Sequence, residues 1–131
     1  MLDHIGIKVT DIKRSKTFYD QALKPLGVGV VMEVSEEEAR TFGQTAFMGY
    51  GEGEKPYFWI NQQPRATELI HVAFATDSRA KVDAFYAAAI AAGGRDNGPP
   101  GLRPHYHASY YGAFVLDPDG HNIEAVCHKP E

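Results

Sequence analysis

The stretch YGAFVLDPDGHNIEAVCH, residues 111–128, decides the fold. Residues 111–116 and 122–128 indicate two strands, and the intervening DPDG indicates a tight turn, because Asp, Pro and Gly meet the dihedral angles that such turns require. Side chains alternate between the faces of a strand, so Glu124 lies on the face opposite the small apolar residues Ile123, Ala125 and Cys127. A Glu on a lone hairpin is usually a solvated surface residue, and its role depends on the rest of the chain.

Length and composition predict one globular domain over residues 1–131. Apolar residues make up 44% of the chain, charged residues 23%, and the formal charge is −4, so no general attraction to nucleic acid or anionic lipid is expected. No apolar run approaches the roughly 20 residues that cross a bilayer, and no leader-like segment precedes the first strand. The single cysteine, Cys127, fits a reducing compartment. We therefore predict a cytoplasmic protein that binds neither nucleic acid nor membrane.

The first half of the chain has the pattern of a strand, a helix and three further strands. Residues 3–9 alternate like a strand with one packed side, and a helix capped by Thr10 or Asp11 follows, with apolar side chains at spacings of three and four. Three later segments have strand-like composition, and an acidic turn at residues 35–38 and a loop rich in Gly and Glu separate them. They are residues 29–34, 44–50 and 57–62.

The same pattern begins again at Leu69, with LIHVAFAT as a strand and a helix after it. Equivalent residues are 67 positions apart, as in His4 and His71, Phe18 and Phe85, Tyr19 and Tyr86, Gly27 and Gly94, and Ala46-Phe47 and Ala113-Phe114. A fixed offset across strand, helix and later strand indicates two copies of one βαβββ unit. We therefore predict an α+β fold of two paired βαβββ modules, module 1 over residues 1–64 and module 2 over residues 67–128, whose sheets form a curled mixed sheet.

The segment between Arg95 and Tyr110 departs from the repeat. It is rich in Gly and Pro, which indicates a loop, and it carries His105, His107 and aromatic rings. One interpretation is a functional loop. The other is that its tyrosines cover a hydrophobic edge while both histidines are solvated.

Two histidines and one glutamate form a candidate metal site. His4 and His71 hold equivalent places in the first strand of each module, on the face away from the branched apolar residues, and Glu124 faces the same way from the last strand. If the modules pair about a pseudo-twofold axis, the two imidazoles converge. Two imidazoles and one carboxylate on rigid strands suit a divalent metal ion with open positions, namely iron, manganese, nickel, cobalt or zinc.

Three segments resemble the vicinal oxygen chelate superfamily, which includes glyoxalase I, bleomycin-resistance proteins, fosfomycin-resistance thiol transferases and extradiol dioxygenases. They are DHIGIKVTDIKRSKTFYDQAL at 3–23, HVAF at 71–74 and AFVLDPDGHNIEAV at 113–126. The resemblance implies modules that curl around a metal cavity, with His4, His71 and Glu124 at the ligand positions. It also implies a homodimer, with modules paired within one chain or exchanged between two. His121 and His128 match no ligand position and are expected at the surface or behind the ligands.

The chain departs from the glyoxalase I pattern at the fourth ligand. That pattern places a glutamate on the last strand of the first module, which here is PYFWINQ and has no carboxylate. The repeat offset places Tyr57 at that position, and a small shift places Phe58 or Trp59 there. Tyr57 and Trp59 share a face, so we expect an aromatic pocket wall. A site with three protein ligands resembles those of the dioxygenases and the fosfomycin transferases more closely, and the chain length suits the latter.

The resemblance implies a metal-dependent, glyoxalase-like enzyme that binds a small substrate through neighbouring oxygens, as a lyase, isomerase or thiol transferase. His107 and Tyr110 are candidates for acid–base catalysis or for hydrogen bonds to the bound oxygens. The substrate would be lined by Tyr57, Trp59, Arg103 and His105. An extradiol-type dioxygenase with an iron site of two His and one Glu is an alternative, and a metal-free ligand-binding protein like those of bleomycin resistance is another.

Overall fold

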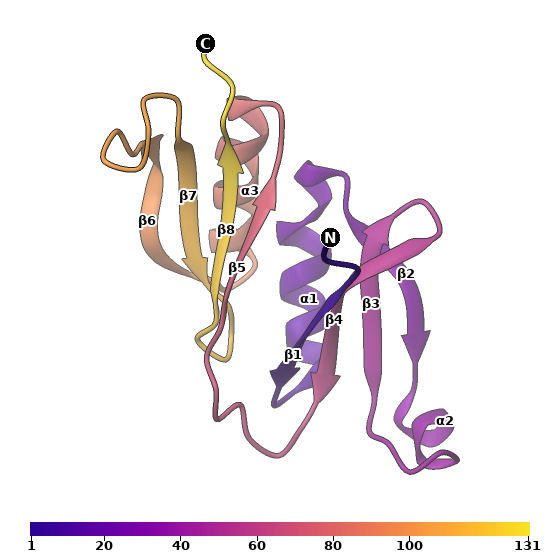
Figure 1. Ribbon diagram of the computed structural model, residues 1–131. Coiled ribbons are helices and arrows are strands. Elements are labelled where there is room, and N and C mark those ends of the chain that lie inside the picture. Colours follow the sequence, from indigo (N-terminus) through magenta and orange to yellow (C-terminus); the bar gives the residue numbers. More distant parts are fainter.

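The first sheet of the structure, a computed structural model that describes residues 1–131, is built from the first half of the chain (Figure 1). Its order is β1-β4-β3-β2, with β1 parallel to β4 and the other neighbours antiparallel. The elements of this half are β1 (Ile5–Val9), α1 (Ile12–Ala22), the 3-10 helix η1 (Lys24–Leu26), β2 (Gly29–Val34), α2 (Glu36–Arg40), β3 (Phe47–Glu52) and β4 (Lys55–Gln62).

The second sheet repeats this topology in the order β5-β8-β7-β6, with β5 parallel to β8. Its half of the chain contains β5 (His71–Ala75), α3 (Arg79–Ala91), β6 (Arg95–Leu102), β7 (Tyr111–Leu116) and β8 (Asn122–Cys127). The predicted α+β fold of two βαβββ modules is confirmed. The two sheets remain separate, because β1 and β5 are edge strands that do not pair with each other.

The long helices begin at the residues that the sequence indicates. Asp11 caps α1, since its side chain accepts hydrogen bonds from the backbone N–H groups of Lys13 and Arg14. Ser78 caps α3 in the same way. Gly27 closes the turn after η1 with a φ of 79°, a left-handed conformation that glycine adopts without a steric cost. No helix is long and apolar enough to span a membrane.

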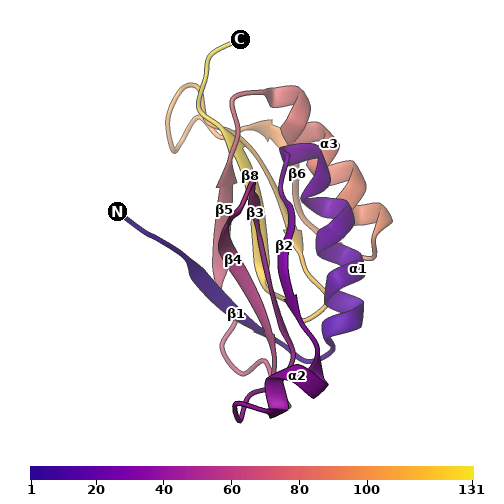
Figure 2. The same ribbon diagram turned by 90° about the vertical axis from the view of Figure 1, so that its right-hand side faces the viewer.

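One hydrophobic core is shared by both modules. In Figure 2 the helices α1 and α3 lie on one side of the two sheets, and they pack against each other and against the apolar strand faces. The rings of Phe58 on β4 and Phe74 on β5 meet edge to face, with centroids 5.2 Å apart. Cys127 is 1% exposed and belongs to the same core. The faces away from the helices are therefore free to carry polar and functional side chains.

A buried carboxylate in the turn between β7 and β8 ties this hairpin to α1. Asp117 is 1% exposed and accepts a hydrogen bond of 2.5 Å from the hydroxyl of Tyr19 on α1. It also accepts hydrogen bonds from the backbone N–H groups of Asp119 and His121. Asp119 in turn accepts a hydrogen bond of 2.6 Å from the hydroxyl of Thr10, just before α1. Module 1 is thus docked onto the turn of module 2 by directional bonds.

His121 belongs to the same network, which corrects the expectation that it lies at the surface or behind the metal ligands. Its side chain is fully buried. Its Nδ1 accepts from the backbone N–H of Ile70, 3.1 Å away, so its proton is on Nε2 and is donated to the carbonyl oxygen of Lys8 at 2.7 Å. One imidazole thereby satisfies backbone groups of β1 and of the linker. We call Asp117, Asp119 and His121 the turn network.

Two predicted loops are regular structure. Residues 95–102 form the strand β6, although they are rich in Gly and Pro. This is possible because β6 is an edge strand, and its two prolines lie where its register with β7 shifts, between Gly98 and Gly101. The expected acidic turn is the short helix α2, whose first turn Ser35 caps by accepting from the N–H of Glu38.

Replacing Asp117 by Ala is expected to lower the free energy of unfolding by about 2 to 4 kcal/mol, because the buried Tyr19 hydroxyl and two backbone N–H groups of the turn lose their acceptor. Urea denaturation measures this. Asp77→Ala is the matched control, since that side chain is 65% exposed and its ion pairs are 3.9 Å long, so a change within about 0.5 kcal/mol is expected. Equal losses in both variants would contradict the role of the turn network.

Alkaline pH should destabilise the fold through Tyr19. Burial, and secondarily the charge of Asp117, raises the pKa of this phenol well above its ordinary value. In the unfolded chain the phenol ionises near about pH 10, so the stability that its protonated form provides is complete below that pH and is lost as pH rises above it. Between pH 9 and 11, the stability of Tyr19→Phe should fall less steeply with pH than that of the parent. Parallel curves would refute this assignment.

Candidate metal centre

His71 and Glu124 meet on the face of the second sheet that points away from the helices. His71 begins β5 and Glu124 lies in the middle of β8, its parallel neighbour. The Nε2 atom of His71 is 2.7 Å from Oε1 of Glu124. The side chain of Glu124 is 1% exposed and that of His71 is 52% exposed. The pair therefore presents a buried negative charge behind an imidazole that solvent can reach.

Tyr110 holds the other oxygen of this carboxylate by donating a hydrogen bond to Oε2 of Glu124. Desolvation, and then the hydrogen bond to Glu124 and its charge, raises the pKa of Tyr110, so the phenol stays protonated as a donor. Gly112 makes this arrangement possible. A Cβ there would lie 3.2 Å from the Tyr110 ring and 3.4 Å from Oε2 of Glu124. Both oxygens of Glu124 are thus oriented, one by Tyr110 and one by His71.

The spacing of this pair fits two ligands of one cation. Ligand atoms at about 2.0 to 2.2 Å from a shared metal ion lie roughly 3 Å apart in a tetrahedral or octahedral site. The observed 2.7 Å between Nε2 and Oε1 needs only a small opening for a metal ion to replace the hydrogen bond between them. The chemistry of the donors, an imidazole and a carboxylate, matches the predicted set of iron, manganese, nickel, cobalt and zinc.

His4, the third predicted ligand, lies apart from this pair within the chain. Its side chain is 59% exposed, and its Nδ1 is 2.7 Å from Oδ1 of Asp3. The same carboxylate oxygen forms an ion pair of 2.9 Å with Nζ of Lys55. No three His, Cys, Asp or Glu side chains of one chain are close enough to hold a metal ion. The structure therefore brings together two of the three predicted ligands, His71 and Glu124. His4 lies apart from them because it precedes β1 in the other sheet, and the two sheets are not joined at β1 and β5.

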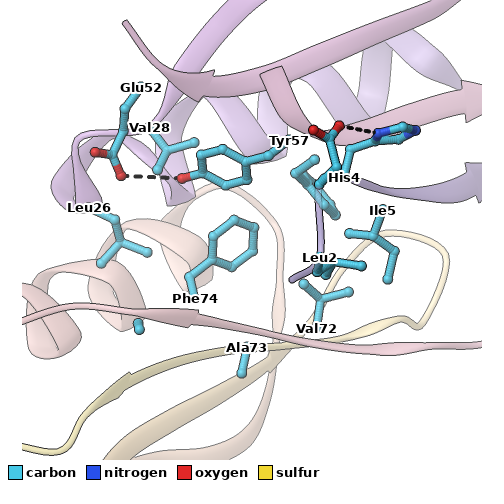
Figure 3. Close-up of a pocket in the computed structure, with 13 residues that line it drawn as sticks. Leu2, His4, Ile5, Leu26, Val28, Glu52, Tyr57, Val72, Ala73 and Phe74 are labelled. Carbon is cyan, nitrogen blue, oxygen red and sulfur yellow. Dashed lines mark hydrogen bonds and ion pairs between the residues drawn. The ribbon is translucent and has the colours of Figure 1, made fainter. Parts of the chain in front are cut away.

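A cavity of about 220 Å³ lies along the seam between β1 and β5 and has a mainly apolar lining (Figure 3). We call it the seam cavity. Tyr57 lines it, beside Leu2 and Phe74. The hydroxyl of Tyr57 donates to Glu52 at 3.3 Å, and burial followed by the charge of Glu52 raises its pKa to about 12. Tyr57 and Trp59 were expected on one pocket wall. Tyr57 lines the seam cavity, whereas Trp59 lines a different pocket.

Trp59 lines a pocket of about 380 Å³ on the open face of the first sheet, together with His4. We call it the Trp59 pocket. Gly49 provides the room for the indole, since a Cβ at that position would lie 2.9 Å from the ring. Phe47 packs beside it with ring centroids 5.9 Å apart. The remaining lining residues are Gly6, Gln44 and Asn61.

Arg103 and His105 line a third pocket, of about 310 Å³, on the open face of the second sheet. We call it the Arg103 pocket. Phe114 lies between this pocket and the candidate ligands, since its ring centroid is 5.4 Å from the Arg103 guanidinium carbon and 6.1 Å from the centroid of the His71 ring. Asn122 also lines the pocket and was not predicted, although the period of two on β8 places it on the same face as Glu124.

His107 is linked to Glu124 only through Tyr110. Its ring centroid is 5.5 Å from that of Tyr110. Its Nδ1 accepts from the backbone N–H of Ser109, so its Nε2 carries the proton and donates to Nδ1 of His128 at 2.5 Å. His128 is exposed, in line with its expected surface position. His107 is thereby fixed behind Tyr110, and the structure does not place it against the His71–Glu124 pair.

Comparison with known proteins places these features in a family context. The model of the glyoxalase/bleomycin resistance protein/dioxygenase superfamily matches residues 1–125. A lactoylglutathione lyase from Haemophilus influenzae is 30% identical over 133 residues, which cover 96% of this chain and 91% of that protein. The crystal structure of a glyoxalase/bleomycin resistance protein from Albidiferax ferrireducens has a TM-score of 0.75 and 32% identity, with 98% of each chain covered. A fosfomycin resistance protein from Listeria monocytogenes, crystallised with Mn(II) and a dihydroxypropylphosphonic acid, shares the fold, with a TM-score of 0.69, 16% identity, and 98% and 90% of the two chains covered.

Proposed function

Because the chain belongs to the glyoxalase/bleomycin resistance protein/dioxygenase superfamily, we propose that it is a metal-dependent, glyoxalase-like enzyme that binds a small substrate through two neighbouring oxygens. The observation that carries this proposal is the pair of His71 and Glu124, 2.7 Å apart on adjacent strands. A carboxylate that is 1% exposed is costly to bury, and a metal ion would compensate that cost. A divalent metal held by His71 and Glu124 would supply Lewis acidity to the substrate oxygens.

The third ligand in this proposal is His4 of a second copy of the chain. Two facts favour this over a single-chain site. The edges of β1 and β5 are unpaired, and an unpaired strand edge readily adjoins another chain. The apolar side chains of Leu2 and Leu69 are 77% and 62% exposed near the ends of these strands, in a position for a partner to cover. A homodimer that places module 1 of one copy beside module 2 of the other would bring His4 to His71 and Glu124.

Tyr110 and the aromatic side chains have defined roles in such a site. Tyr110 orients Glu124 and, as a neutral phenol, can give a hydrogen bond or a proton to an oxyanion that forms on the substrate. His107, fixed by Ser109 and His128, supports the ring of Tyr110 from behind. Trp59 and Phe114 would form apolar walls that limit the access of water to the reacting atoms.

The reaction that we propose depends on the fourth ligand of the glyoxalase I pattern, a glutamate that β4 of this chain lacks. The Haemophilus influenzae relative is named a lactoylglutathione lyase, which favours lyase or isomerase chemistry for this chain. Yet β4 carries only aromatic side chains at the positions where the resemblance to glyoxalase I would require a glutamate, and Tyr57 faces the seam cavity. A thiol transferase, or an extradiol-type dioxygenase with an iron site of two His and one Glu, is therefore the second candidate.

Metal content is the direct test. Protein purified without chelator or affinity metal should contain about one transition-metal ion per chain by elemental analysis. The variants His71→Ala and Glu124→Gln should lose most of it while retaining the circular dichroism spectrum of the parent. His105→Ala, which removes an exposed imidazole that contacts neither His71 nor Glu124, is the matched control and should keep its metal. Equal metal in Glu124→Gln, or no uptake by the parent from iron, manganese, nickel or zinc, would favour a metal-free binding protein.

Mixing two variants that each lack one proposed ligand, and so are each expected to lack metal, tests whether the site is shared between chains. When His4→Ala and Glu124→Gln chains are unfolded together and refolded, random pairing gives heterodimers with one intact site, so about a quarter of the metal content should return. A mixture of His71→Ala and Glu124→Gln is the control. Both changes lie in module 2, no intact site can form, and the metal content should stay low. Recovery in neither mixture would exclude the shared site.

A further inference from the structure

The guanidinium of Arg103 is held in a fixed place without an anionic partner. Its terminal nitrogens donate to the carbonyl oxygens of Gly101 at 2.9 Å and Pro99 at 2.7 Å. Its carbon lies 5.4 Å from the centroid of the Phe114 ring. None of the ion pairs of the chain involves it. The remaining N–H groups of the fork are therefore preorganised and have no carboxylate to bind.

The strand β6 leaves room for this side chain at two glycines. A Cβ at Gly98 or at Gly101 would lie 3.2 Å from a terminal nitrogen of Arg103. Gly98 also has a backbone φ of 146°, which residues other than glycine rarely adopt. These features explain why the Gly- and Pro-rich sequence of β6 accompanies Arg103. The strand fixes a cation against its own backbone.

The Arg103 pocket is lined by hydrogen-bonding groups and contains no acidic side chain. Besides Arg103 and Phe114 it presents Asn97, His105, Tyr106 and Asn122. The side-chain oxygen of Asn122 is buried and has no hydrogen-bond partner, and such groups in native proteins are usually satisfied when water or a ligand is bound. A pocket with one cation, several polar groups and no negative charge is suited to an anion.

The pocket adjoins the proposed metal ligands. Phe114 lies opposite Glu124 in the register of β7 and β8, and its ring lies near both Arg103 and His71. The ring of Tyr106, which lines the pocket, packs edge to face against the ring of Tyr110, with centroids 4.9 Å apart. One small molecule can therefore reach both places.

We propose that Arg103 binds an anionic group of the substrate, a carboxylate, phosphate or phosphonate, while the neighbouring oxygens of the same molecule lie at His71 and Glu124. This inference rests on the proposed function and names the class of substrate. A planar guanidinium binds such groups through two parallel hydrogen bonds, which gives orientation as well as affinity. The anionic group would set the position of the substrate along the sheet.

The test uses inorganic phosphate and acetate as probes of the full-length protein. Each is titrated while the backbone amides of Gly98, Gly101 and Arg103 are followed by NMR. Saturable shifts at these amides are expected, and the stronger of the two anions identifies the class of group. Arg103→Gln should weaken binding on the order of tenfold or more, and Arg103→Lys should weaken it less, because lysine keeps the charge and loses the fork.

The matched control is Arg95→Gln, which removes an exposed positive charge from the other end of the same strand and should leave binding unchanged. The same titration in Glu124→Gln separates this inference from the metal assignment. Anion binding that depends on Arg103 and persists in Glu124→Gln supports the subsite even where metal binding fails. Binding of neither anion, or equal binding in the parent and in Arg103→Gln, overturns the subsite even where metal binding succeeds.

Discussion

The carboxylate of Asp117, buried between the last hairpin and the first helix, fixes how the two modules sit on each other. The core around it is apolar, and apolar contacts are largely non-directional, so they favour association of the modules without defining one orientation. The hydrogen bonds from Tyr19 and from the turn backbone, together with His121 between Lys8 and Ile70, are directional and have specific partners. Because this network ends where β8 begins, it also fixes the start of the strand that carries Glu124.

Asp117 and Glu124 are both 1% exposed, and their surroundings indicate different purposes. Asp117 accepts from a buried phenol and from two backbone N–H groups, so its charge is fully used inside the fold. Glu124 accepts from Tyr110 and faces an imidazole that is half exposed, which leaves its charge available on the solvent side. Stability alone does not require Glu124 at this position, since a buried ion pair is often no more stabilising than well-packed apolar residues of similar volume. The desolvation cost of burying the Glu124 carboxylate would be offset if the carboxylate bound a ligand.

Local patterns predicted most of the fold and part of the site. The period of two on β8 located Glu124, and the offset of 67 residues predicted both modules, because each signal is contained in neighbouring residues or in an internal repeat. His121 was misjudged because its partners, Lys8 and Ile70, are distant in sequence and are backbone groups that no side-chain pattern reveals. β6 was missed because Gly and Pro indicate a loop, and only its edge position with a register shift allows a strand. Whether His4 reaches His71 depends on how the two sheets, or two copies of the chain, lie relative to each other. No local sequence pattern contains that information.

The repeat also shows how the two halves have become chemically different. Phe47 and Phe114 are equivalent residues, and each helps to line a pocket on the open face of its own sheet. The neutral ring of Trp59 packs beside Phe47, whereas the cation of Arg103 lies over the ring of Phe114. The open face of module 1 therefore carries an imidazole and an aromatic wall, and that of module 2 carries an imidazole, a carboxylate, a phenol and a guanidinium. A site assembled from both would be polarised, with a cation at one side and apolar rings at the other. Such a site favours a substrate that has an anionic group at one end and an apolar or planar group at the other.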